Sequence, residues 1–466
     1  MQRITSQRAE SGLGTLLEIA RFELKNRIHS KATYLYFAAF FVLGFLIVNS
    51  LAGLKGTNLS IEMPGFEYAN APLTIMMVLA IFSAQGLVFA AGIFSQSACQ
   101  DFETKFANIL FSFPIAEWQY VVGRLIAAVV LTVFILFGLG IGYLVGEWMP
   151  WLDTEKLLPF NGLSYLAPYF YIIIPNILIF GGFFFGVGML TRQTLMVYLT
   201  GIALFAGGTI CNGIFSQNAP WFASLLDAAG ISALGTITKY WSPAQIAREF
   251  IPLSGDLVIN RLLWLGLSGA FLGWSISQFR FSQLATTPKR RYQGQQAIAL
   301  EQEPILQTAL IAPTRIHQSF NTFDQLRLLS SQTLIEFQTL LKNRWFLAAL
   351  LIAIFPSMVA AGNSAKELYN TPMLPLTHLL VQQAASLYAD LFKLLIIFLG
   401  GEMVWRDRTT RINQIIDTLP IRTYVPLLSK LGALALVVVS TLLMILVSGV
   451  TDEAPPPACA RWRCLC

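Results

Sequence analysis

Charged residues are scarce in this chain. Asp, Glu, Lys and Arg make up 12% of the 466 residues, whereas hydrophobic residues make up 55%. Soluble domains carry roughly 25% charged residues, so this composition excludes an ordinary soluble protein. Several charge-free runs reach the ~20 residues that a helix needs to cross a bilayer, where lipid offers the backbone no hydrogen-bond partner. The sequence therefore predicts an all-α, polytopic helical membrane protein.

Motifs for nucleotide hydrolysis and for zinc chemistry are also missing. The sequence contains no G-x-x-x-x-G-K-[ST] phosphate-binding loop and no H-E-x-x-H zinc motif, so neither ATP hydrolysis nor peptidase activity is assigned to it. The three histidines, His29, His317 and His378, are far apart, which disfavours a metal or acid–base site built on them. The five cysteines show no zinc-type spacing. We expect no catalytic residue, no metal and no cofactor in this chain.

About nine apolar runs are long enough to span a membrane. They lie at about residues 32–54, 73–98, 125–146, 163–190, 195–214, 262–278, 345–361, 380–401 and 428–449. The fourth run contains Pro168 and Pro175, so we expect a kinked or interrupted helix there. The stretch between the fifth and sixth runs includes Trp221 and Pro243 and is too broken for another span. It is typical of surface-lying or re-entrant helices.

The order of these runs divides the chain into five predicted parts. They are a cytoplasmic N-terminus with a basic amphipathic elbow helix (1–31), a first six-span unit (32–278), a cytoplasmic linker (279–333), half of a second related unit (334–450) and an atypical tail (451–466). The N-terminus lacks the apolar core of a cleavable secretory signal. The tail combines three prolines with three cysteines. It indicates a truncated or altered reading frame, with a genuine short tail as the alternative.

Lys and Arg residues fall mostly on one side of the predicted spans. If the N-terminus is cytoplasmic, the majority lie in cytoplasmic segments, as the positive-inside rule requires. We therefore expect a multi-pass protein of the cell inner (cytoplasmic) membrane with its N-terminus in the cytoplasm. The net charge of +6 could suggest nucleic acid, but the basic residues alternate with the spans. No nucleic-acid partner is expected.

One polar stretch occurs twice. Residues 99–125, CQDFETKFANILFSFPIAEWQYVVGRL, are echoed at a constant offset by residues 405–431, WRDRTTRINQIIDTLPIRTYVPLLSKL. The offset pairs Asp101 with Asp407, Thr104 with Thr410, Pro114 with Pro420, and Arg124 with Lys430. An LKNR motif precedes a span in both copies, at residues 24–27 and 341–344. The repeat predicts two cytoplasmic knobs suited to a cleft on a soluble partner, the alternative being two plain connecting loops.

Charges inside these loops are spaced to pair along a helix. Asp101 and Lys105 lie one turn apart, as do Asp407 and Arg411. Such a pair stabilises a helix by roughly 0.2–0.5 kcal/mol.

In these residues the sequence resembles the permease subunits of ATP-binding-cassette exporters of the second exporter type, in which six spans follow an amphipathic elbow helix. In that family the loop between spans two and three begins with charged residues, continues through a short hydrophobic helix and a proline, and ends at a basic residue. The residues that match are Asp101, Glu103, Pro114 and Arg124, and again Asp407, Arg408, Pro420 and Lys430. The family's usual Glu-Arg-Glu start is CQDFE in one copy and RDRTT in the other.

The resemblance covers residues 12–278 as a full unit and 331–450 as half of one. It extends to the membrane part of longer permease/aminopeptidase fusion proteins, here in a truncated form. It implies a transporter permease and not an enzyme, with ATP bound by a separate ABC ATPase subunit. The implied ATPase-coupling residues are Asp101, Glu103, Lys105, Pro114, Arg124, Asp407, Arg408, Arg411, Pro420 and Lys430. The lipid bilayer and a second permease chain, or self-association, are the other expected partners.

Two opposite charges lie inside the eighth predicted span. Asp390 and Lys393 are one turn apart, where a single charge would be costly. They are interpreted as a self-neutralising pair, as a polar element of a translocation path, or with Lys393 reaching the membrane surface. An intramembrane enzyme, such as an acyltransferase, would need more polar groups than these, and a membrane scaffold without transport is a third reading.

Overall fold

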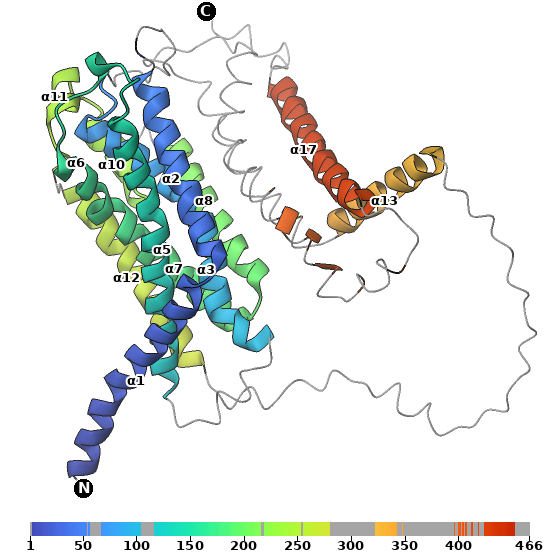
Figure 1. The fold of residues 1–466 in the computed structure, drawn as a ribbon, viewed down its shortest axis with the longest axis horizontal. Coiled ribbons are helices and arrows are strands. Elements are labelled where there is room, and N and C mark those ends of the chain that lie inside the picture. Colours follow the sequence, from blue (N-terminus) through green and yellow to red (C-terminus); the bar gives the residue numbers. More distant parts are fainter. Residues whose placement is uncertain are drawn as a thin grey trace, which may run out of the picture.

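The computed structural model describes residues 2–53, 55, 67–103, 116–215, 219–252, 255–279, 322–342 and 424–452, with isolated positions between 347 and 418. In these residues the regular elements are helices, with no strand, as the all-α prediction requires. The first unit contains α1 (Gln2–Ile28), α2 (Lys31–Ala52), α3 (Pro72–Glu103), α5 (Glu117–Glu147), the short 3₁₀ helix η1 (Thr154–Lys156), α6 (Gly162–Pro168), the π-helix η2 (Tyr169–Ile173), α7 (Ile174–Thr191), α8 (Thr194–Phe215), α9 (Pro220–Leu226), α10 (Ile231–Thr238), α11 (Pro243–Arg248) and α12 (Gly255–Gln278). Helices α13 (Thr322–Lys342) and α17 (Tyr424–Asp452) follow (Figure 1).

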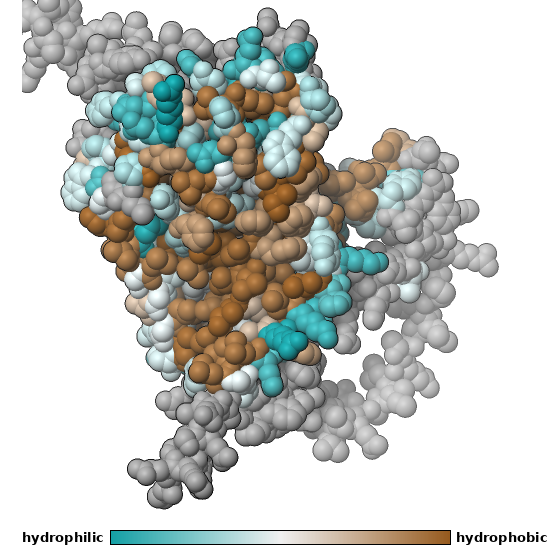
Figure 2. Space-filling model, turned by 60° about the vertical axis from the view of Figure 1, so that its left-hand side comes forward, coloured by the Kyte–Doolittle hydropathy of each residue, from teal (hydrophilic) through white to brown (hydrophobic). Residues whose placement is uncertain are grey.

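Six helices among the described residues are long and apolar enough to cross a membrane. They are Lys31–Ala52, Pro72–Phe102, Glu117–Glu147, Gly162–Thr191, Thr194–Asn212 and Gly255–Gln278. These coincide with the six predicted spans of the first unit, and apolar side chains cover the middle of the face seen in Figure 2. The chain is therefore a multi-pass helical membrane protein. Helix α17 covers the predicted ninth span, whereas the seventh and eighth fall almost entirely outside the described residues.

The six spans run alternately up and down. Helix α3 ends and α5 begins at one end of the bundle, which we call the loop end, where α1 also lies (Figure 1). At the opposite end, which we call the far end, backbone hydrogen bonds join Lys55 N to Trp151 O (2.9 Å) and Ala69 N to Lys156 O (3.0 Å). Helix α3 packs against α5, α7 and α8, so the helix that leads into the repeated loop is central to the bundle.

The fourth span is interrupted at its first proline, as predicted. Pro168 ends α6 and is followed by the π-helix η2, after which α7 continues to the loop end. A proline lacks the amide hydrogen that the helical ladder needs, and its ring displaces the preceding carbonyl. The hydroxyl of Tyr169 in η2 accepts from Gly140 N and donates to Leu136 O of α5, both at 3.1 Å. The interruption is therefore anchored on the neighbouring span.

Close backbone contact joins α2 to α5. A Cβ atom added to Gly44 would lie 2.1 Å from Leu139 O, and one added to Gly142 would lie 1.9 Å from Phe41 O. Membrane helices use small residues in this way because the hydrophobic effect does not drive helices together in lipid. Their association therefore depends on close packing. The crossing of α2 and α5 depends on these two glycines.

Several helix boundaries differ from the sequence prediction. Helix α3 continues past the predicted end at residue 98 to Glu103, and α5 begins at Glu117 instead of near residue 125, so both ends of the first repeated loop are helical. Helix α13 begins at Thr322, inside the range 279–333 assigned to the linker. Apolar runs mark the limits of the bilayer, whereas helices continue into polar sequence until a residue breaks them.

The second unit is represented by two packed helices. Helix α13 packs along α17, and a small apolar cluster unites Leu340 of α13 with Ala433 and Val437 of α17. The same cluster includes Leu199 and Ile202 of α8. In the second unit the elbow helix α13 thus packs against the third span α17, as α1 packs against α5 in the first unit.

Candidate functional site: paired charge clusters at the repeated loops

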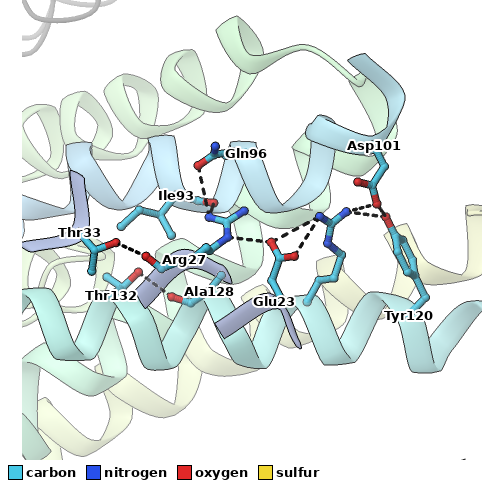
Figure 3. Close-up of polar contacts among 10 residues, drawn as sticks. Glu23, Arg27, Thr33, Ile93, Gln96, Asp101, Tyr120, Ala128 and Thr132 are labelled. Atoms are coloured by element: carbon cyan, nitrogen blue, oxygen red, sulfur yellow. Dashed lines mark hydrogen bonds and ion pairs between the residues drawn. The ribbon is translucent and has the colours of Figure 1, made fainter. Parts of the chain in front are cut away.

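Four charged side chains and one tyrosine meet where the first repeated loop leaves the bundle. They are Glu23 and Arg27 of α1, Asp101 of α3, and Tyr120 and Arg124 of α5, which we call the first cluster (Figure 3). The helical phase explains the meeting: Glu23 and Arg27 are one turn apart on α1, and so are Tyr120 and Arg124 on α5.

Hydrogen bonds link the members of the first cluster in a chain. Arg27 Nε donates to Glu23 Oε1 at 2.7 Å, and Arg124 Nη2 donates to Glu23 Oε2 at 3.3 Å. Arg124 Nη1 donates to Asp101 Oδ2 and also to Tyr120 Oη, the latter at 2.6 Å. Tyr120 Oη donates to the same Asp101 oxygen at 2.5 Å. The elbow helix is thereby fastened to both ends of the loop.

The first cluster is buried and electrically neutral. Glu23 is 7% exposed, Arg27 8% and Arg124 5%, and two cations face two anions. Removing one member of a buried ion pair typically costs about 3–5 kcal/mol, because the other charge is left without compensation. The geometry of the loop base is therefore fixed by electrostatics as well as by packing.

Arg27 extends the first cluster along α3. Its Nη1 donates to Ile93 O at 3.3 Å, and Thr33 Oγ1 of α2 donates to Arg27 O at 2.7 Å. Burial lowers the pKa of Arg27, and the negative charge of Glu23 opposes that shift. The guanidinium still carries its proton, because arginine does not deprotonate in proteins.

The second copy of the loop carries a corresponding set of charges, which we call the second cluster. Its members are Glu336, Arg406, Asp407 and Lys430. Lys430 Nζ donates to Asp407 Oδ2 at 2.5 Å and lies 3.9 Å from Glu336 Oε1, while Arg406 pairs with the other oxygen of Glu336. Again two cations face two anions, and the elbow helix supplies one carboxylate.

Four of the predicted coupling residues are brought together in pairs. Asp101 meets Arg124, and Asp407 meets Lys430, so two positions that correspond in the repeat form an ion pair between an aspartate and a basic residue in both copies. Glu103 is the last residue of α3. The other predicted residues lie outside the described part of the chain: Lys105, Pro114, Arg408, Arg411 and Pro420, together with Asp390 and Lys393. Pairing of Asp101 with Lys105 and of Asp407 with Arg411 stays a prediction.

Five members of the clusters were not among the predicted coupling residues, namely Glu23, Arg27, Tyr120, Glu336 and Arg406. Glu23 is four residues before Arg27, and this spacing could have indicated it. Glu336 gave no such signal, because it lies five residues before its LKNR motif whereas Glu23 directly precedes the first one. Tyr120 aligns with Pro426 in the repeat, so recurrence could not reveal it.

Polar side chains at the far end fasten loops to spans. Asn70 Nδ2 donates to Glu147 Oε1 at 2.6 Å, and Tyr165 donates to the other oxygen of Glu147. Asn260 Nδ2 of α12 donates to Ser224 O at 2.6 Å, at the end of α9. The Asn260 bond holds α9, one of the short helices between α8 and α12, and the shortness of these helices fits the prediction that this stretch is too broken to span the membrane.

Comparisons with protein-family models, curated proteins and solved structures found no match. Among the described residues, no group of three or more His, Cys, Asp or Glu side chains has an arrangement that could hold a metal ion. The candidate site is thus defined by the two charge clusters and the loops that they close.

Proposed function

We propose that this protein is the membrane-spanning permease component of an ATP-driven exporter, coupled to separate ATPase subunits through loops 99–124 and 405–430. The observation that supports this proposal is the recurrence of the ion pair at the base of both loops, each time with a carboxylate from the elbow helix. A loop that only connects two spans needs no such network of ion pairs, whereas a loop that receives force does.

The clusters suggest how movement of a bound ATPase would reach the spans. In the first unit, the end of α3, the start of α5 and the elbow helix α1 share one hydrogen-bonded network. A displacement of the loop would therefore move these three helices together instead of being absorbed at the loop ends. ATP binding and closure of the partner subunits would then tilt spans one, two and five. In this proposal the loop end faces the cytoplasm of the inner membrane.

Affinity purification in mild detergent tests the proposal. We expect a tagged wild-type chain to retain an ATPase subunit, and we expect disruption of both loops, with Pro114 and Pro420 replaced together by short glycine insertions, to release it. A matched insertion beside the exposed Glu155 at the far end serves as the control and should leave binding intact. An ATPase that stays bound after both loops are disrupted, or the absence of any ATPase from the wild-type preparation, would contradict the proposal.

A further inference from the structure

A cavity lies beside Lys430 in the second unit. It measures about 110 Å³ and is lined by Gln332, Ile335, Glu336, Asp407, Pro426, Ser429 and Lys430. Ile335 is 61% exposed, so the cavity reaches the surface at that side chain. Three of its lining residues belong to the second cluster.

The first unit has no corresponding need for a ligand, because Tyr120 occupies the equivalent position. The offset that aligns Asp101 with Asp407 and Arg124 with Lys430 aligns Tyr120 with Pro426. In the first cluster the Tyr120 ring lies against Arg124, whose Cζ is 5.4 Å from the ring centroid, and its hydroxyl bonds both charged neighbours. Proline supplies neither an aromatic ring nor a hydroxyl group. Two residues that line the cavity, Asp407 and Lys430, are the counterparts of the two residues that the Tyr120 hydroxyl contacts.

The polar atoms around the cavity call for a ligand that donates a hydrogen bond. Gln332 Oε1 is buried and has no hydrogen-bond partner, and such an acceptor is costly to leave unsatisfied. Lys430 Nζ already donates to Met403 O and Asp407 Oδ2, both at 2.5 Å. The carboxylates of Glu336 and Asp407 are balanced by Arg406 and Lys430, so a net charge on the ligand gains nothing.

Size selects among neutral donors. An apolar cavity of roughly 150 Å³ accepts benzene, so a cavity of about 110 Å³ suits a single ring that remains partly exposed. Water alone would satisfy Gln332 but would leave the pyrrolidine ring of Pro426 and the alkyl side chain of Ile335 without an apolar partner. We propose that the second unit binds a small neutral phenol in this cavity, its ring beside Pro426 and its hydroxyl donating to Gln332 or Asp407. The proposal is independent of the exporter function.

Fluorine NMR of para-fluorophenol with the full chain in detergent tests this site. We expect a bound resonance that excess phenol displaces, and only a weak one from fluorobenzene, which has the ring without the donor. Pro426→Tyr supplies the missing side chain in the first turn of α17, where proline is not required, and should weaken para-fluorophenol binding by about tenfold or more. Pro426→Ala leaves the cavity open and should retain binding.

The two Pro426 variants and the two ligands together decide whether the phenol site exists. Loss of the bound resonance in Pro426→Tyr, with retention in Pro426→Ala, supports it. The proposal is overturned if fluorobenzene binds as well as para-fluorophenol, if Pro426→Tyr binds para-fluorophenol as well as the wild type does, or if both variants lose the bound resonance. A wild-type chain without any bound resonance would also overturn it, because the cavity would then hold only water.

Discussion

At the scale of single residues, the charge clusters carry the most information about this protein. Arg124 is the residue on which the first cluster depends, because it bonds a carboxylate from α1, a carboxylate from α3 and the hydroxyl of Tyr120. Lys430 has the corresponding place in the second unit and bonds Asp407 and a backbone carbonyl. An arginine can reach more partners with its planar fork of donors than a lysine can. The first unit uses this capacity to bridge three helices.

Replacing Arg124 should therefore destabilise the first unit strongly. We expect Arg124→Met to lower the free energy of unfolding by about 3–5 kcal/mol, because the buried carboxylate of Glu23 and the mostly buried carboxylate of Asp101 would have fewer positive neighbours. Arg124→Lys, which installs the residue of the second copy, should cost clearly less. Denaturant unfolding of the detergent-solubilised chain measures both. Equal losses for the two variants would show that the charge of Arg124 has little part in stability.

The contribution of the Tyr120 hydroxyl to stability should also be measurable by itself. Because it bonds two charged groups, we expect Tyr120→Phe to cost about 1.5–3 kcal/mol. Tyr424→Phe is the matched control, since Tyr424 is 43% exposed and its hydroxyl bonds the uncharged side chain of Gln325. That change should be nearly neutral. If Tyr120→Phe leaves the free energy of unfolding unchanged in the same assay, the hydroxyl does not stabilise the first cluster as expected.

At the scale of helices, the crossing of α2 and α5 brings two backbones closer together than any other glycine of the described first unit does. The backbones of Gly44 and Gly142 face carbonyl oxygens at distances that leave no room for a side chain. We expect Gly142→Ala to cost about 1–3 kcal/mol, because the helices must separate to admit a methyl group. Gly269→Ala on α12, where nothing lies within 4 Å of the added atom, should be neutral or slightly stabilising.

The comparison of those two variants has a clear contrary result. If thermal unfolding in detergent shows equal effects at Gly142 and Gly269, close packing at the crossing is not what holds α2 to α5.

Helices also show what could and could not be predicted from the sequence. The six spans of the first unit follow from the apolar runs alone, and the interruption of the fourth follows from Pro168. The ends of α3 and α5 do not follow, because polar residues at 99–103 and 117–124 limit the bilayer without breaking a helix.

Part of the candidate site could also be predicted from the sequence. Recurrence in the two loops revealed Asp101, Arg124, Asp407 and Lys430, since identical spacing from helix end to helix start keeps their contacts. It could not reveal Glu23 and Glu336, because the two elbow helices present their carboxylates from different turns. Contacts that depend on how one helix slides along another leave no fixed spacing in the sequence.

At the scale of the whole molecule, an even number of spans in the first unit places both of its ends on one side. The loop between α7 and α8, with Gln193 exposed, then lies opposite the far-end segment that contains Glu155. In a background without the native cysteines, we expect Glu155→Cys to react with an impermeant maleimide in intact cells and Gln193→Cys to react only after permeabilisation. The reverse labelling pattern would place the N-terminus outside and remove the proposed access of an ATPase to the loops.

The balanced charges of the two clusters have an electrical consequence. A single elementary charge that moves through the full membrane potential exchanges about 2.3 kcal/mol of work per 100 mV. Each cluster holds two cations and two anions, so a tilt that carries it as one body transfers no net charge through the field. In the proposed exporter, movement of either cluster as one body would therefore draw no work from the membrane potential.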